Sequence, residues 1–323
     1  MDVLHVSGLT KRFGAVTAND AIDLRVGAGE VVGLLGHNGA GKTTLISQVV
    51  GLLRPDAGSI RVGAVNAVAD PATARTLVAL QAQGQAPLDG LTPRRAIELT
   101  ARIRGLTRSE ARRAAQRIAD ELDITGWLDR RALPDGRGIS GGVRRLVSFA
   151  MTVAVPAPLV VLDEPTNDVD ASRRPRLWKT VRRLADEGAG VLLVTHNVAE
   201  AERVVDHLVV LEKGRVVAHG TPAQLRGTAD TDVTLELHLP AGGDHEAAAL
   251  PIPPMVVHQQ VIDGRRLRLT IPSADAATAV AWAARLRTGG DVEGFTLSPA
   301  TLEDTYLALT ATGQERAQEL SDA

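Results

Sequence analysis

Glycines, one lysine and two threonines form a compact group at residues 36–44, with the sequence GHNGAGKTT. Glycine permits backbone conformations that a Cβ forbids, and it lets the chain approach a ligand closely. Successive N–H groups in such a loop form a concave anion site, and a following helix adds the positive end of its dipole. A lysine placed here reaches the β- and γ-phosphates, and the adjacent threonine ligates Mg²⁺. The predicted phosphate loop therefore comprises Gly36, His37, Asn38, Gly39, Ala40, Gly41, Lys42, Thr43 and Thr44.

The flanks of this loop fit a strand and a helix. Residues 31–35 are an apolar run, and residues 45–53 have the apolar periodicity of a helix. Strand, loop and helix together are the context in which the Gly-x4-Gly-Lys-Thr pattern binds phosphate. The alternative is a glycine-rich turn without a ligand, and these flanks disfavour it.

Two carboxylates follow a second apolar run. Residues 159–162 are typical of a buried parallel strand, and Asp163 and Glu164 come at its end. Ligand groups of α/β sheets lie at such strand ends. We expect Asp163 to hold Mg²⁺ through water and Glu164 to polarise an attacking water. A charged strand end without a function is the alternative, and the phosphate loop upstream disfavours it.

Two further segments carry candidate phosphate contacts. The apolar run 191–195 ends in His196, which should lie at the same sheet edge as Asp163 and contact the γ-phosphate. Ser140 is expected to cap a helix from Val143 to about residue 155, with the N–H groups of Gly141 and Gly142 left uncovered as a second anion site. One chain rarely needs two such helix starts for one nucleotide, so the second indicates a site completed by another subunit.

Two weaker signals keep alternatives open. Phe13 lies beside a glycine, and its ring either stacks on a nucleotide base or belongs to ordinary packing. Gln81, Gln83 and Gln85 follow an apolar strand at 77–80. A glutamine amide oxygen can ligate Mg²⁺ or hold a water, while a solvated polar loop is the alternative.

Between these motifs the sequence predicts inserted helices. Thr92 and Pro93 are typical of a helix start, and residues 107–110 form a plausible capping box for a second helix. Arginines 112, 113 and 117 fall on the wet face of that helix and are interpreted as a solvated surface. A helical segment of about 90–130 is thus inserted into an α/β frame.

Composition limits the function classes. The chain has 323 residues with 44% apolar content, enough for two domains, and its net charge of −2 argues against a general polyanion-binding surface. Without cysteine it can form neither disulfides nor thiolate sites. We find no signal peptide and no apolar run long enough to span a bilayer.

Residues 230–323 are predicted to be a separate α+β module. Val233, Leu235, Leu237 and Leu239 alternate as in a strand, and the pair at 263–264 separates two further strands. A helix is expected from Ser273 to Leu286, then a strand around Phe295. Ser298 and Pro299 are expected to start a final helix that carries Leu302, Tyr306 and Leu309.

The motifs of residues 1 to about 228, and their order along the chain, resemble those of the ATP-binding subunit of an ABC transporter. Residues 36–44 resemble the Walker A loop, 159–164 the Walker B strand, 139–143 the signature and 167–170 the D-loop, which ends in Asp170. Gln83 resembles the Q-loop glutamine, with Gln81 as a rival, His196 the switch histidine and Phe13 the base-stacking aromatic. The sequence departs from the common pattern at His37, where proline is commoner, and at Val143, which ends the signature.

The resemblance implies an α/β P-loop NTPase of ABC type, with an antiparallel β subdomain and a helical subdomain at about 90–155. The ATP-binding domain would cover 1–228, and a small α+β accessory domain 229–323. ATP and Mg²⁺ are the implied cofactors, with Thr43, Gln83 and Asp163 at the metal and Lys42, Glu164 and His196 as catalytic residues. Two copies would face each other head to tail, and ATP would lie between the loop of one and Ser140, Gly141 and Gly142 of the other.

The implied function is hydrolysis of ATP to power a separate membrane exporter for a drug, antibiotic or lipid-like substrate. The tail motif at 301–306 is similar to that of daunorubicin-resistance exporters. The protein would be cytoplasmic and bound to the inner face of the membrane through its permease. That permease is expected to dock near residues 83–91, where Pro87, Leu88 and Leu91 should be exposed. The alternative is a soluble ABC ATPase acting on ribosomes or nucleic acid, but no nucleic-acid partner is expected.

Overall fold

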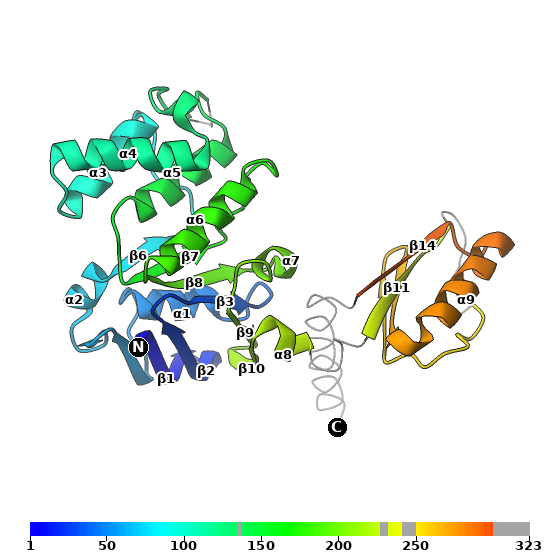
Figure 1. Cartoon of the computed structure of the whole chain (residues 1–323). Helices are drawn as coiled ribbons and strands as arrows, with labels where there is room; N and C mark the ends of the chain where they lie inside the picture. The colour runs from blue at the N-terminus through cyan, green and yellow to red at the C-terminus, as the bar shows by residue number, and fades with distance from the viewer. Residues whose placement is uncertain (135–136, 227–231, 241–249, 300–323) are drawn as a thin grey trace. The chain divides into compact units, whose positions relative to one another are not determined.

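The computed structural model describes residues 1–134, 137–226, 232–240 and 250–299. The chain divides into two compact units, Met1–His219 and Gly220–Ala323, which are described separately below (Figure 1). The domain boundary predicted between residues 228 and 229 falls in a segment outside the described residues, so it stays a prediction.

The first sheet of unit 1 is antiparallel. It comprises β1 (Asp2–Phe13), β2 (Val16–Gly27), β4 (Ala57–Val62) and β5 (Val65–Asn66), in the order β2-β1-β4-β5. Ile22, Leu24 and Val26 are buried while the residues between them are exposed, as their alternation predicts. This one-sided burial places one face of the sheet in the hydrophobic core of the unit.

The second sheet of unit 1 has six strands in the order β10-β9-β3-β8-β7-β6. They are β3 (Val31–Leu35), β6 (Val78–Gln81), β7 (Leu159–Asp163), β8 (Gly190–Thr195), β9 (His207–Glu212) and β10 (Arg215–Gly220). The pairs β3–β8, β7–β8, β6–β7 and β3–β9 are parallel. Every residue of β3, β7 and β8 is buried, which explains why these strands are continuous apolar runs.

The helix α1 (Lys42–Val49) packs between the two sheets. Its Leu45, Ile46 and Val49 join one hydrophobic cluster with residues of β1, β2, β3, β7 and β8. The segment 50–53, which the apolar periodicity includes in this helix, lies beyond its end. The helices α2 (Pro71–Thr76), α6 (Arg174–Asp186) and α7 (Val198–Ala201) complete this part of the unit.

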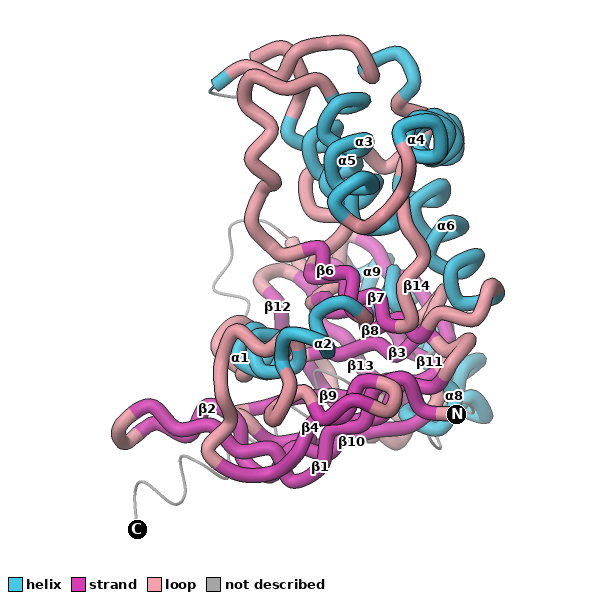
Figure 2. The backbone as a smooth tube through the Cα atoms, turned by 90° about the vertical axis from the view of Figure 1, so that its left-hand side faces the viewer, coloured by secondary structure: helices cyan, strands magenta, loops and turns pink. Residues whose placement is uncertain are grey.

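Three helices form the inserted helical region. They are α3 (Pro93–Ile103), α4 (Arg108–Leu122) and α5 (Gly141–Val153), which gather at one end of the unit, away from the antiparallel sheet (Figures 1 and 2). Thr92 caps α3 and Thr107 forms a full capping box with Glu110, so both predicted helix starts are confirmed. The predicted start of α5 at Val143 is wrong by two residues: the Ser140 hydroxyl accepts the Val143 N–H, so Gly141 and Gly142 are already helical.

In its described residues, unit 2 contains a four-stranded antiparallel sheet on which a helix packs. The strands β11 (Asp232–His238), β12 (Gln259–Asp263), β13 (Arg266–Pro272) and β14 (Gly294–Pro299) are ordered β12-β13-β11-β14. The helix α9 (Ala276–Gly289) packs Trp282 and Leu286 onto Leu235, Leu269 and their neighbours. The short helix α8 (Pro222–Arg226) precedes this sheet in the chain.

The predicted helix start at Ser298 and Pro299 is wrong. Both residues belong to β14 and pair with Thr234 and Val233 of β11. Proline is tolerated there because β14 is an edge strand. The rest of that predicted helix, with Leu302, Tyr306 and Leu309, and the tail motif at 301–306 lie outside the described residues. Among the helices that the structure does describe, none combines the length and the apolar character needed to cross a bilayer.

The capping box of α4 gives a first test. Thr107→Ala removes the hydroxyl that accepts the Glu110 N–H, so we expect a loss of about 1 kcal/mol in stability. For a unit of this size the melting temperature should fall by about 2–4 °C. Arg117→Ala on the exposed face of the same helix is the control and should leave it unchanged. Equal melting temperatures for Thr107→Ala and the wild type would show that the cap contributes nothing.

Candidate functional site

The glycine-rich loop joins β3 to α1 and is held between two neighbouring segments. Gly41 adopts a φ of +104°, and a Cβ at this position would lie 2.3 Å from the backbone oxygen of Ala18 on β2. The Asn19 side chain donates a hydrogen bond to the Gly41 carbonyl at 3.2 Å, and the Gly214 N–H donates to the Ala40 carbonyl at 3.0 Å. The loop is therefore shaped by β2 and by the turn between β9 and β10.

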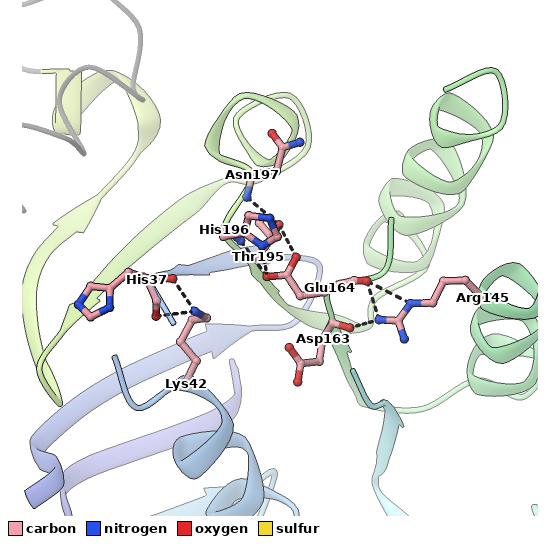
Figure 3. A network of polar contacts seen from close by, with 9 residues as sticks. His37, Lys42, Arg145, Asp163, Glu164, Thr195, His196 and Asn197 are labelled. Carbon is pink, nitrogen blue, oxygen red and sulfur yellow. Dashed lines mark hydrogen bonds and ion pairs between the residues drawn. The ribbon is translucent and has the colours of Figure 1, made fainter. Parts of the chain in front are cut away.

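Lys42, the first residue of α1, is folded back over this loop. Its ammonium group donates to the carbonyl oxygens of Gly36 and of His37, the latter at 3.0 Å (Figure 3). Burial lowers the pKa of Lys42, while the nearby Glu164 and Asp163 carboxylates act in the opposite direction. The ammonium thus lies at the loop where the sequence places phosphate.

A cavity of about 600 Å³ opens in front of the loop. It is lined by loop residues, by residues of the parallel-sheet edge and by the β1–β2 region: Val16, Thr17, Ala18, His37, Asn38, Gly39, Gly41, Lys42, Thr43, Thr44, Gln83, Asp163, Glu164, Lys213 and Gly214. The structure therefore brings most of the predicted loop, the Q-loop candidate Gln83 and both carboxylates to one cavity. The predicted loop residues Gly36 and Ala40 are not part of its lining, and both are buried.

The two carboxylates at the end of β7 differ in their surroundings. Both are buried, and burial together with the neighbouring Glu164 charge raises the pKa of Asp163. Arg145 and Lys42 act against this rise. Asp163 thus pays a desolvation cost when it is ionised, which a bound cation would remove.

Glu164 is held by the end of β8. Its carboxylate accepts the Thr195 hydroxyl at 3.1 Å and the His196 backbone N–H at 2.9 Å. The His196 ring contacts the same carboxylate through Nδ1 at 2.7 Å (Figure 3). The parallel pairing of β7 and β8 explains this meeting, because both strands end at the same edge.

The signature residues lie elsewhere on the same chain. Ser140 is exposed, and neither it nor Gly141 and Gly142 lines the cavity. Gly142 packs against the D-loop segment, where a Cβ would lie 2.3 Å from the Asp168 carbonyl oxygen. The Asp170 carboxylate forms an ion pair with Arg173 at 2.7 Å and is also absent from the lining. The structure therefore does not bring these predicted residues to the cavity of their own chain.

The two glutamine candidates have different environments. Gln81 is fully buried at the end of β6 and donates to the Arg145 carbonyl oxygen at 3.3 Å. Gln83 is exposed and lines the cavity. This placement favours Gln83 as the residue that reaches a ligand.

The predicted base-stacking ring is not in the cavity wall. Phe13 is 52% exposed and lies under the Lys11 ammonium, 5.6 Å from the ring centroid. Its strand partner Val16, which the sequence analysis did not select, is part of the wall instead. Val16 is thus an apolar residue of this hairpin in the wall, and Phe13 lies next to it outside the wall.

Sequence reasoning missed three polar residues in the cavity wall or directly behind it. Lys213, in the turn between β9 and β10, brings a second cation to the cavity. Thr195 binds the Glu164 carboxylate, and its position just before His196 is a signal that could have been used. Arg145 binds backbone oxygens behind the carboxylates, and no local pattern in the sequence distinguishes it from the arginine beside it.

The residues predicted for Mg²⁺ share one cavity. Thr43, Gln83 and Asp163 all line it, and they offer hydroxyl, amide and carboxylate oxygens, the hard ligands that Mg²⁺ prefers. In the described part of the chain no group of three His, Cys, Asp or Glu side chains could hold a metal by itself. This donor set fits an ion that keeps several waters and is also bound by phosphate.

Comparisons with known proteins agree with this geometry. The profile of the ABC transporter family matches residues 19–167. A daunorubicin/doxorubicin resistance ATP-binding protein of Streptomyces peucetius is 34% identical over 95% of this chain and 92% of its own length. A Nod factor export ATP-binding protein of Mesorhizobium japonicum is 33% identical over 96% of this chain and 87% of its own length.

Solved structures show the same fold. An ATP-binding subunit of an ABC transporter, 30% identical, matches with a TM-score of 0.64 over 69% of this chain and 92% of its own. A bacterial ABC transporter cassette solved as a dimer, 21% identical, matches with a TM-score of 0.61 over 68% of this chain and 98% of its own. The P-loop α/β architecture predicted from the motifs is thereby confirmed.

The buried Asp163 predicts a pH dependence of stability. Its folded-state pKa lies above the 3.8 of an unperturbed aspartate, so the folded chain holds this proton more tightly than the unfolded chain does. The free energy of unfolding should therefore fall as the pH rises from 3.8 through the folded-state pKa, and the loss is complete above that value.

Without nucleotide, Asp163→Asn should remove this part of the pH dependence and raise the melting temperature at pH 7 above that of the wild type. The control Asp186→Asn changes an exposed carboxylate on α6 and should keep the wild-type pH dependence. A melting temperature of Asp163→Asn that follows the wild type from pH 4 to 8 would contradict the prediction.

Proposed function

The chain belongs to the ABC transporter family, and we propose that it powers a separate membrane exporter for a drug, antibiotic or lipid-like substrate. It binds and hydrolyses ATP, as an ATP-binding subunit of this family. The relatives named above are ATP-binding proteins of daunorubicin/doxorubicin resistance and of Nod factor export, which supports transport over an action on ribosomes or nucleic acid. The observation that carries the proposal is one cavity that joins Lys42 to Asp163 and Glu164.

We assign ATP binding first to the loop and to Lys42. Residues of the loop and of the start of α1 line the cavity, and their N–H groups would donate to phosphate oxygens. Lys42 now donates to the carbonyls of Gly36 and His37, and phosphate oxygens would replace these partners. Val16, with Phe13 beside it in the hairpin, would then lie against the base.

Hydrolysis needs a group that orients water. Glu164 faces the cavity, and three contacts from Thr195 and His196 fix its carboxylate. A fixed carboxylate can accept a proton from a water beside the γ-phosphate. The His196 ring contacts the Glu164 carboxylate through Nδ1, and Nε2 would donate to a phosphate oxygen when it carries a proton.

Mg²⁺ would be held by Thr43, by Gln83 and, through water, by Asp163. The ion supplies charge neutralisation between the phosphates. The protein's contribution is to keep the three oxygen donors on one wall of the cavity. Because ionised Asp163 is disfavoured by burial, this site is set to accept a cation.

A second copy of the chain would complete the site. Ser140, Gly141 and Gly142 lie outside the chain's own cavity, while the hydroxyl of Ser140 is exposed at the start of α5. In a head-to-tail pair these groups would reach the triphosphate bound by the other copy, and Asp170 would lie near the contact. Charge stabilisation supplied by a partner changes rates by ~10³–10⁵ in related phosphate-loop enzymes, so an isolated copy should be nearly inactive.

The Q-loop segment would contact the permease on the cytoplasmic side of the membrane. The protein would thus lie on the inner face of the membrane. The expected apolar docking surface there needs correction: Pro87 is exposed, but Leu88 is 1% exposed and Leu91 is half-buried. Leu88 therefore belongs to the core and cannot contact a partner. Gln83, Gln85 and Pro87 remain exposed in this segment.

Replacement of the water-orienting carboxylate tests the proposal. Glu164→Gln should retain ATP binding, because the loop is unchanged, and lose at least about 100-fold in turnover. ATP should then trap a closed pair, visible as a dimer by size-exclusion chromatography.

The control is Glu187→Gln, an exposed glutamate at the end of α6, which should hydrolyse ATP normally. Wild-type turnover in Glu164→Gln would remove this residue from its role. Absence of turnover in the unmodified protein together with its permease would contradict the proposed function as a whole.

A further inference from the structure

Arg145 lies in α5, one turn beyond the signature glycines, and is 3% exposed. We propose that Arg145 is a positioning residue for ATP hydrolysis, which fixes the backbone of Glu164 and ties the Gln83 segment to it. This inference rests on the proposed function. It assigns a role to a residue that touches neither the cavity nor the reacting atoms.

All the bonds of the guanidinium go to backbone oxygens. Nε donates to the Glu164 carbonyl at 3.1 Å, and Nη2 donates to the carbonyls of Glu164, at 2.5 Å, and of Asp163 (Figure 3). Nη1 donates to the carbonyls of Ala82 and Gln83, both at 2.9 Å. Within the described residues no carboxylate lies within 4.0 Å of it as an ion-pair partner.

The topology explains why these oxygens need such a partner. The ladder between β6 and β7 runs up to the pair Gln81 and Leu162. Beyond this pair the ladder between the two strands ends, and the next carbonyl oxygens need donors from elsewhere. A guanidinium has five N–H donors in a planar fork, so one arginine can serve both chain segments at once.

The backbone conformation of Glu164 depends on these hydrogen bonds. Its φ is +50°, a left-handed backbone conformation that residues other than glycine rarely adopt. Such a conformation persists only when the surrounding structure fixes it. The carboxylate is held by Thr195 and His196 of the β8 end, and the carbonyl is held by Arg145 of α5. Loss of the hydrogen bonds from Arg145 to the Glu164 carbonyl would let the Glu164 peptide rotate, and its carboxylate would move.

The same guanidinium makes Gln83 and Glu164 shift together. Their carbonyls share one donor group, and the Gln81 side chain ties the Arg145 backbone to β6 at 3.3 Å. Gln83 belongs to the segment proposed to meet the permease, and α5 begins with the residues proposed to meet the second ATP. A displacement of either would therefore reach the water-orienting carboxylate through Arg145.

Arg144 provides a matched control on the same helix. It is 6% exposed and pairs with Asp89 at 2.8 Å, and it also donates to the Leu133 carbonyl. It binds no backbone oxygen of Gln83 or Glu164. Both arginines are thus buried and bonded, but only Arg145 reaches the catalytic carboxylate's backbone.

The test compares Arg145→Lys, Arg145→Met and Arg144→Lys in the full-length chain. Lysine keeps the charge but loses the planar fork. We expect kcat of Arg145→Lys to fall about 100-fold, as for a small displacement of a catalytic group, with the Kd for ATP unchanged. Arg144→Lys should keep its kcat, although its melting temperature falls like that of Arg145→Lys.

A second measurement does not depend on turnover. Amide hydrogen exchange of the nucleotide-free chain should become faster at residues 82–85 and 163–168 in Arg145→Lys but not in Arg144→Lys.

The proposal is overturned by unchanged exchange at these segments, by wild-type kcat in Arg145→Lys, or by an equal loss of kcat in Arg144→Lys. It is also overturned if both Arg145 variants fail to fold, since the residue then supports the fold as a whole. A wild-type chain without ATPase activity would contradict the proposed function instead, and the exchange measurement would still decide the role of Arg145.

Discussion

The parallel pairing of β3, β7 and β8 determines where the chemistry of this molecule takes place. These strands end at one edge of the same sheet, so the loop after β3, the carboxylates after β7 and the histidine after β8 meet there. The residues come from positions 36 to 196 and share no local segment. Each strand is buried on both faces, which leaves its end as the one place where polar side chains can reach solvent.

This edge brings together charged groups that the protein's own side chains balance only in part. Lys42 is turned onto carbonyl oxygens, and the Asp163 carboxyl has its pKa raised by burial and by the charge of Glu164. Binding of an anion at the loop and of a cation near Asp163 would relieve both costs together. The proposed ligand, a metal–nucleotide complex, would supply both ions at once.

The motifs predicted the parallel sheet, the phosphate loop and the carboxylates because strand ends and loop chemistry are local in sequence. The resemblance favoured Gln83 over Gln81, but residues two apart point to the same face of a strand, so alternation by itself could not tell which of the two lies at the cavity. Leu88 was expected to be exposed, yet the tertiary structure buries it. Arg145 could not be identified either, because its partners lie 62, 63, 18 and 19 residues away.

The C-terminal unit shows the same limit. Local patterns predicted the alternation in β11 and the turn before β13. Ser298 and Pro299 are typical of a helix start, but their pairing with β11 places them in a strand.

The central claim is that two copies of the chain build each ATP site. Lys42→Ala inactivates the site to which its own copy contributes the phosphate loop. Ser140→Arg inactivates the site whose phosphate loop belongs to the other copy. Neither variant should turn over ATP by itself. In an equimolar mixture half of the pairs combine both variants and keep one intact site, so about a quarter of wild-type turnover should return. A mixture as inactive as its components would contradict the shared site.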